Sequence, residues 1–222
     1  MTIRENSPIV PGSAARGEAE ILDTRTEWEN KTARLLVDRV RFPAQHGGEP
    51  VEREQFRLVH GAKVSHGVII VPVERDGRIV LLRQFRHPVR MWIRELPRGA
   101  TELGESPAEA ARRELREELG LDAAEIFSLG RIVNDSGQLG GVPHLVAAMV
   151  DGREASEREP TELVRGEFRY TFEELRRACW RGEIIDSFTL CAVARLAPHF
   201  GDDGRFRYRA EEVAGRVEPE PE

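Results

Sequence analysis

The pattern of apolar and polar residues first predicts a hairpin near the middle of the chain. Continuous apolar runs at 68–73 and 79–82 flank Asp76-Gly77, the dipeptide of a tight turn. Unbroken runs of this kind indicate strands that are buried on both faces. Later strands are predicted at 125–133, at 144–150 and in a short stretch that ends at Tyr170.

The preceding stretch, residues 18–59, is predicted to form a small β-region of its own. Residues 33–40 have a strand pattern, 45–50 are rich in turn residues, and 51–59 alternate loosely as a returning strand. A region of this size cannot bury its own apolar face. We therefore expect it to pack against the main domain or a second subunit.

Helical signals begin at Ser106, which suits the N-cap of a helix. Pro107 suits the first helical position, and Glu109 completes a capping box. Gly120 is a natural residue for the end of the same helix. Two later helices are predicted, one capped by Thr171 with Glu174 in the capping-box position and one at 187–198.

Strands, one helix, further strands and two final helices define an α+β fold with a mixed sheet between helices. The main domain is expected at 60–200. Residues 1–17 lack periodicity and are predicted to form a disordered tail, and residues 201–222 an acidic C-terminal tail.

Composition restricts the classes of function. The net charge of −6 argues against general nucleic-acid binding, and no apolar run approaches the length of a membrane span. Cys179 and Cys191 lack metal spacing, so we expect reduced, buried thiols in a cytoplasmic protein.

Carboxylates gather on the helix that follows Ser106. Glu114, Glu117 and Glu118 stand at i, i+3 and i+4 and therefore share one face, where like charges repel. Neighbouring arginines can offset this charge as a solvated salt-bridge face. A hard divalent cation such as Mg²⁺ or Mn²⁺, which prefers oxygen ligands, can offset it better.

The whole segment from residue 99 to residue 121 resembles the Nudix box, G-x5-E-x7-R-E-U-x-E-E-x-G-U, in which U is a bulky aliphatic residue. Every defined position is filled, by Gly99, Glu105, Arg113, Glu114, Leu115, Glu117, Glu118, Gly120 and Leu121. The resemblance implies the α/β/α sandwich of the Nudix fold and metal-dependent cleavage of a pyrophosphate bond.

The resemblance also implies roles for single residues. Glu114 and Glu118 bind one or two ions, Glu117 shares a second ion, and a backbone carbonyl near Gly99 adds a ligand. Arg113 pairs with Glu105 to orient the loop against the helix, which is a structural role.

The general base in the ADP-ribose pyrophosphatase branch of this family is often a glutamate on a loop before a late strand. Counting back from Thr171 places that loop near Glu162, with Glu159 and Glu157 as rivals. These residues can equally be surface glutamates. In that case the base role returns to the box, to Glu117.

Substrate contacts are predicted outside the box. The segment R-Q-F-R-H-P at 83–88 looks like one common in Nudix enzymes acting on ADP-ribose and other nucleotide sugars, and Arg83 or Arg86 could clamp a phosphate. Trp28 could stack on an adenine, but a tryptophan that packs in the core or at an interface is the more common case.

The sequence is therefore interpreted as a cytoplasmic, Mg²⁺-dependent Nudix hydrolase of a nucleoside diphosphate derivative, with ADP-ribose as the leading substrate and a homodimer as the expected form. In the named branch the N-terminal β-region is shared across a dimer. Asp135-Ser136-Gly137 lacks a proline common in ADP-ribose enzymes, and Gly140-Gly141 replaces polar residues. A nucleotide sugar or dinucleotide hydrolase and a non-catalytic nucleotide-binding module are the alternatives.

Overall fold

The computed structural model describes residues 17–44, 47–60, 64–151 and 164–210. The chain divides into two compact units. The N-terminal unit contains the residues up to His66 together with Val133–Gly141, and the main unit contains Gly67–Ile132 and the chain from Val142 onward. Each unit is described by itself.

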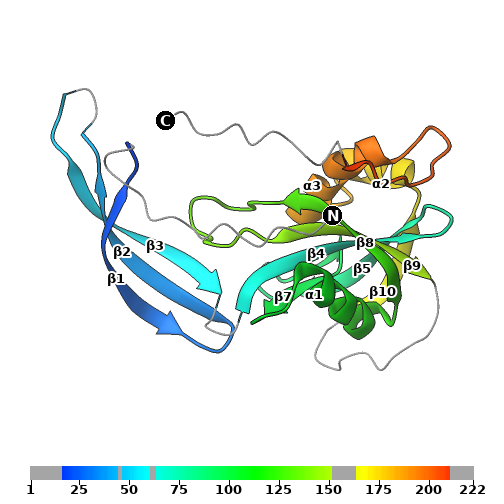
Figure 1. Ribbon diagram of the computed structural model, residues 1–222, viewed down its shortest axis with the longest axis horizontal. Helices are drawn as coiled ribbons and strands as arrows, with labels where there is room; N and C mark the ends of the chain where they lie inside the picture. The colour runs from blue at the N-terminus through cyan, green and yellow to red at the C-terminus, as the bar shows by residue number, and fades with distance from the viewer. Residues whose placement is uncertain (1–16, 45–46, 61–63, 152–163, 211–222) are drawn as a thin grey trace. The chain divides into compact units, whose positions relative to one another are not determined.

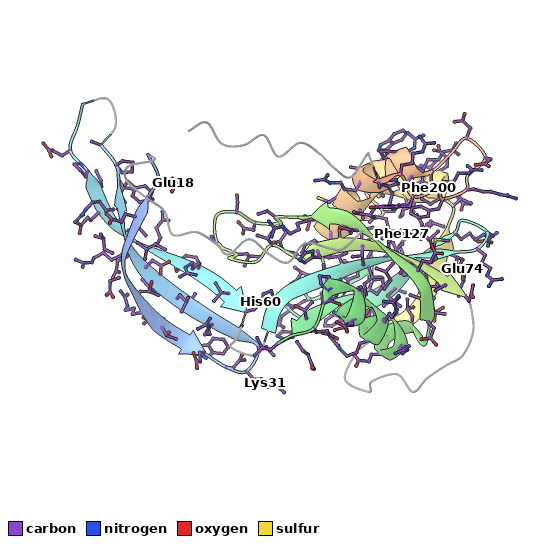
Figure 2. All side chains as sticks on the ribbon, viewed as in Figure 1. Glu18, Lys31, His60, Glu74, Phe127 and Phe200 are labelled. Atoms are coloured by element: carbon purple, nitrogen blue, oxygen red, sulfur yellow. The ribbon has the colours of Figure 1, made fainter. Side chains whose placement is uncertain are left out.

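The N-terminal unit is built on a three-stranded antiparallel sheet in the order β1-β2-β3. Its strands are β1 (Glu20–Glu29), β2 (Ala33–Phe42) and β3 (Val51–His60). Figure 2 labels Lys31 in the turn between β1 and β2, and His60 at the end of β3. The strands at 33–40 and 51–59 are confirmed, whereas β1 was not predicted as a strand because most of its residues are polar or charged.

The main unit contains a seven-stranded mixed sheet with the path β10-β5-β4-β9-β8, in which β6 pairs with β5 and β7 with β4. Strand β4 runs parallel to β9 and antiparallel to β5. The strands are β4 (Val64–Glu74), β5 (Ile79–Arg86), β6 (Met91–Glu95), β7 (Arg98–Glu102), β8 (Asp122–Arg131), β9 (His144–Asp151) and β10 (Val164–Tyr170).

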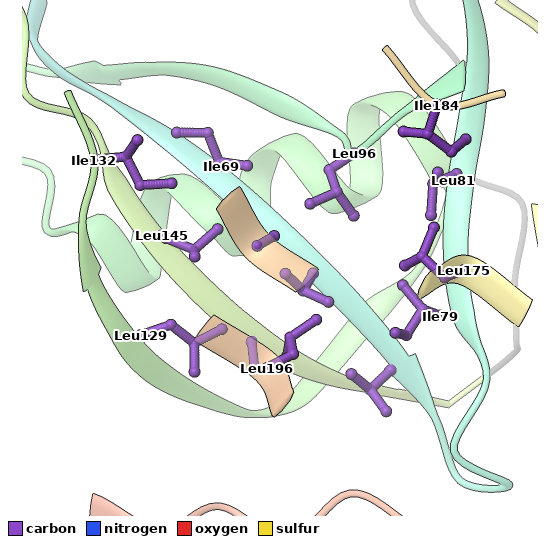
Figure 3. Packing of buried hydrophobic residues seen from close by; sticks show 14 of the residues in the cluster. Ile69, Ile79, Leu81, Leu96, Leu129, Ile132, Leu145, Leu175, Ile184 and Leu196 are labelled. Carbon is purple, nitrogen blue, oxygen red and sulfur yellow. The ribbon is translucent and has the colours of Figure 1, made fainter. Parts of the chain in front are cut away.

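Helices cover both faces of this sheet (Figure 1). Alternate residues of β4 and β5 point to opposite faces, because side chains alternate along a strand. Ile69 and Leu81 pack in a cluster with helices α2 (Phe172–Trp180) and α3 (Ser187–Leu196), as Figure 3 shows. Ile70 and Leu82 pack in a second cluster with helix α1 (Pro107–Glu114). The predicted α+β fold with a mixed sheet between helices is confirmed.

The local signals hold at the predicted turn and at the later helices. In the hairpin, Gly77 has φ 88° and donates its N–H to the carbonyl of Glu74 at 2.8 Å. A Cβ on Gly77 would lie 2.6 Å from the carbonyl oxygen of Gly204, so this turn admits only glycine. Helix α2 begins with the expected capping box of Thr171 and Glu174.

The C-terminal part of the main unit extends further than predicted. Phe206 and Tyr208 pack against the cluster beneath α2 and α3, and the ring of Tyr208 stacks on Phe127 with centroids 4.6 Å apart. The Tyr208 hydroxyl donates to the carbonyl of Ser128 at 3.1 Å. The packed chain therefore continues past residue 200, where the tail was expected to begin, because these aromatic residues cover the edge of β8.

Other predictions concern single residues and the ends of the chain. Both cysteines are free, but the expected burial is wrong, because Cys191 is exposed and Cys179 is only partly buried. None of the helices in the described ranges is long and apolar enough to cross a membrane. The predicted tail at 1–17 lies outside the described residues, apart from Gly17.

Candidate active site

The segment from residue 99 to residue 121 contains β7, α1 and a final π-helical turn, η2 (Leu115–Leu119). Helix α1 begins as the sequence predicts. The Ser106 hydroxyl accepts the backbone N–H of Glu109 at 3.3 Å, and the Glu109 carboxylate accepts the N–H of Ser106 at 2.9 Å. These two bonds satisfy two of the backbone donors that the start of a helix leaves without partners.

The end of this helix differs from the α-helix that was expected. Residues 115–119 form a π turn, which closes at Gly120 in the left-handed conformation with φ 67°. Leu115 and Leu119 are both buried in the cluster under α1. A π turn holds more residues than an α turn, so Glu114 and Glu117, three residues apart, lie further from the same face than they would on an α-helix. The wider turn occurs where these two leucines are buried in the core, a packing arrangement that residue spacing in the sequence does not reveal.

This geometry separates the three carboxylates. Glu114 is 9% exposed and Glu118 5% exposed, and both carboxylate oxygens of Glu118 are buried. The side chain of Glu117 is 39% exposed. The expected shared face is therefore divided into a buried pair, Glu114 and Glu118, and a more open Glu117.

Strand β7 places Gly99 directly against the carboxylate of Glu114. A Cβ on Gly99 would lie 1.9 Å from the Glu114 carboxyl carbon and 1.9 Å from its Oε1. No side chain fits there, so the glycine is required for Glu114 to occupy this position. The carbonyl oxygen of Gly99 lies near Gly67 of β4, 3.7 Å from where a Cβ on Gly67 would be.

Arg113 makes most of the polar side-chain contacts at this site. Its Nε and Nη2 donate to the two oxygens of Glu105, each at 3.1 Å, and Nη2 also donates to the carbonyl of Ala100 at 2.7 Å. Its Nη1 reaches Glu114 Oε1 at 2.8 Å and Glu117 Oε2 at 3.0 Å. The geometry therefore shows the Arg113–Glu105 pair joining the loop to the helix.

These contacts explain the charge states of the pair. Hydrogen bonds from Arg113 to Glu105 raise the pKa of the guanidinium. Burial by itself raises the pKa of the Glu105 carboxyl, but hydrogen bonds from Arg113 and from the backbone N–H of Glu102 outweigh it and hold that pKa below its usual range. Glu105 is therefore an ionised structural group.

The donor set suits a hard cation. Among the described residues, no three His, Cys, Asp or Glu side chains form a cluster that could hold a metal, and the Arg113 guanidinium binds both Glu114 and Glu117. Glu114, Glu118 and the main chain at Gly99 nevertheless offer the oxygen ligands that Mg²⁺ and Mn²⁺ take, and Gly99 leaves room for the Glu114 carboxylate. The residues present fit a divalent ion.

The structure distinguishes the two arginines that were considered for phosphate binding. Arg83 belongs to the alternate residues of β5 that face the α2–α3 side, and its guanidinium lies 5.5 Å from the centroid of the Trp92 ring. Arg86 belongs to the residues that face the α1 side, where its Nε donates to Glu95 at 2.6 Å. Only Arg86 lies on the face of the sheet that carries Glu114 and Glu118.

The remaining predicted residues are not brought to this site by the described structure. Trp28 lies on β1 in the N-terminal unit and is 52% exposed. Glu162, with its rivals Glu157 and Glu159, lies outside the described residues. Their assigned roles remain predictions.

Sequence reasoning missed a buried polar network in front of the box. Glu95 is 0% exposed, and it contacts Arg86 of β5 and Arg98 of β7. The available signal was a glutamate at the end of an apolar segment, directly before Leu-Pro. Such a carboxylate must be paired when it is buried.

Buried carboxylates on one helix, beside a glycine that makes room for them, suit a hydrolase that cleaves phosphate chains with a divalent cation. The family model of the NUDIX domain matches residues 64–188 of this 222-residue chain. The chain therefore belongs to the NUDIX family, and it is a Nudix pyrophosphatase whose chemistry depends on a divalent metal ion.

Known proteins of this kind are similar over most of the chain. The ADP-ribose pyrophosphatase of Mycobacterium tuberculosis is 32% identical over 83% of this chain and 85% of its own. The ADP-ribose pyrophosphatase of Bacillus subtilis is 28% identical over 76% of this chain and 87% of its own. A crystal structure of an ADP compounds hydrolase is 20% identical, with a TM-score of 0.67 over 81% of this chain and 92% of that chain, and shows the same fold.

Proposed function

We propose that this Nudix pyrophosphatase hydrolyses ADP-ribose to AMP and ribose 5-phosphate with Mg²⁺ or Mn²⁺. The observation that carries the proposal is the complete box, in which Glu114 lies against Gly99 and Glu118, four residues further on, is also buried. The two ADP-ribose pyrophosphatases named above support the substrate, because their similarity covers 76% and 83% of this chain.

The roles of the protein groups follow from their positions. Glu114, Glu118 and the Gly99 carbonyl would hold the ion, with Glu117 beside them. Such an ion supplies positive charge against the diphosphate and acidifies water. Arg86, on the same face of the sheet, would bind a phosphate oxygen through its Nη groups, since its Nε is taken by Glu95. Glu162 is the proposed base, with Glu117 as the alternative, and either would accept the proton of the attacking water.

Alternative substrates share the cleaved bond. A nucleotide sugar or a dinucleotide also presents a diphosphate between two groups, and the box does not distinguish these ends. The loop at 134–143, which lacks the proline common in ADP-ribose enzymes and carries Gly140-Gly141, keeps these substrates open. A non-catalytic nucleotide-binding role is disfavoured, since the box is complete and the chain belongs to the NUDIX family.

A hydrolysis screen tests the proposal. The purified protein is incubated with Mg²⁺ and with ADP-ribose, ADP-glucose, a diadenosine polyphosphate and NADH in parallel, and products are identified by mass. ADP-ribose should be turned over fastest, with AMP and ribose 5-phosphate as products. Faster turnover of another compound would contradict the substrate but not the hydrolase class.

The matched variant for this screen is Glu118→Gln. It should keep its fold but lose activity by about 10²-fold or more, because stabilisation of charge in the transition state is the largest catalytic contribution. Glu125→Gln on the exposed surface of β8 is the control and should keep full activity. Near-normal turnover of Glu118→Gln would contradict the metal assignment.

A further inference from the structure

Glu95 is an ionisable group of the main unit that the proposed chemistry does not use. It ends β6 and is fully buried, which is costly for a carboxylate without partners. Its Oε1 accepts Arg86 Nε at 2.6 Å, and its Oε2 lies 2.9 Å from Arg98 Nη2. The second contact is an ion pair whose N–H is not aligned as a hydrogen bond.

Arg98 also connects this network to helix α3, on the opposite side of the sheet. Arg98 Nη1 donates to Asp186 Oδ1 at 3.0 Å. Asp186 caps helix α3, where its Oδ2 accepts the N–H of Thr189 at 2.9 Å and the Thr189 hydroxyl at 2.7 Å. The Thr189 oxygen in turn accepts the N–H of Leu96 at 3.2 Å. Two carboxylates thus balance two guanidinium groups.

These contacts anchor the chain immediately before Gly99. Glu95 is held by Arg86, and Leu96 is held by Thr189. The carbonyl of Pro97 accepts the N–H of Ile70 on β4 at 3.0 Å.

Arg98, the last residue before Gly99, is held by both Glu95 and Asp186. Consecutive anchors of this kind fix the backbone that follows. The next residue is Gly99, where a Cβ would overlap the Glu114 carboxylate.

We infer that Glu95 is a positioning residue for metal binding: it pins the junction of β6 and β7, through Arg98 and Arg86, so that Gly99 and Glu114 keep the geometry that a divalent ion needs. The inference rests on the proposed metal site. Glu95 itself touches neither the ion nor the substrate. Partners that orient metal ligands change metal affinity by about 10- to 100-fold when they are removed.

The test measures binding of Mn²⁺ alone, without substrate, by calorimetric titration or by electron paramagnetic resonance of the free ion. Glu95→Gln keeps the shape of the side chain but removes the carboxylate that Arg86 and Arg98 share, so that Arg98 keeps only Asp186. The Kd for Mn²⁺ should rise by about tenfold or more. An unchanged Kd in a folded Glu95→Gln protein overturns the inference.

The matched control is Glu74→Gln. Glu74 pairs with Arg169 at 2.8 Å in the same unit but at the other end of β4, where Figure 2 labels it. The substitution Glu74→Gln should lower the stability of the protein without changing the Kd for Mn²⁺. An equal loss of Mn²⁺ binding in Glu74→Gln overturns the inference, because the effect would then be general destabilisation.

A second pair of variants covers the case in which Glu95→Gln does not fold. Thr189→Val removes the hydroxyl that accepts the Leu96 N–H, and Thr189→Ser restores it. Thr189→Val should weaken Mn²⁺ binding and Thr189→Ser should recover it, a rescue that simple loss of packing would not give. Equal binding by Thr189→Val and Thr189→Ser overturns the inference.

If the unchanged protein binds no Mn²⁺, the proposed metal site fails together with this inference. Loss of binding in Glu118→Gln but not in Glu95→Gln or Thr189→Val overturns only the inference.

Discussion

At the scale of single residues, Arg113 and Glu105 give a testable dependence on pH. The folded protein holds the pKa of Glu105 below its ordinary value of 4.5, so this carboxylate stabilises the fold above that pH. The contribution is lost as the pH falls through the lowered pKa. The difference in unfolding free energy between the unchanged protein and Glu105→Gln should therefore be largest at neutral pH and shrink below pH 4.5, as measured by urea unfolding. A pH-independent difference for Glu105→Gln would contradict the assignment.

At the scale of elements, the two capping boxes make matched predictions. Ser106 begins α1 and Thr171 begins α2 with the same pair of reciprocal hydrogen bonds. Replacing either residue by alanine leaves the first turn without its acceptor and should cost about 1 kcal/mol of stability. Thermal unfolding of Ser106→Ala and Thr171→Ala measures this loss, with Ser106→Thr and Thr171→Ser as conservative controls. Unchanged melting temperatures for both alanine variants would show that the caps contribute nothing to the folded state.

At the scale of the whole molecule, we propose that the N-terminal sheet forms a homodimer. Residues opposite each other in neighbouring strands share a face. Trp28, Leu35 and Leu58 are aligned in this way, and Phe56 lies beside them opposite Val37. Trp28 and Phe56 are more than half exposed, an apolar surface that soluble proteins usually cover.

Sedimentation at micromolar concentration tests the dimer. The unchanged protein should sediment as a dimer and Phe56→Glu as a monomer, because a buried charge opposes association. Gln55→Glu, on the other face of the same sheet, should remain dimeric. A monomeric unchanged protein, or a dimeric Phe56→Glu, would rule out this interface.

Features that depend only on neighbouring residues could be predicted from the sequence. The Asp76-Gly77 turn, the capping boxes and the box from Gly99 to Leu121 were predictable, because turn conformation, capping and motif spacing are local. The buried strands were predictable as well, since continuous apolar runs have few other folded forms.

The contacts between side chains of distant segments became visible only in the folded structure. Leu96 and Thr189 are 93 residues apart, and no spacing rule joins them. Arg83 and Arg86 look equivalent in the sequence, but the alternation of β5 sends them to opposite faces, and only packing against α1 shows which face carries the carboxylates. The π turn at 115–119 and the aromatic residues beyond Phe200 likewise depend on what the rest of the core presents to them. Side-chain contacts between distant segments are fixed by the packing of the whole fold, and a local pattern does not contain that information.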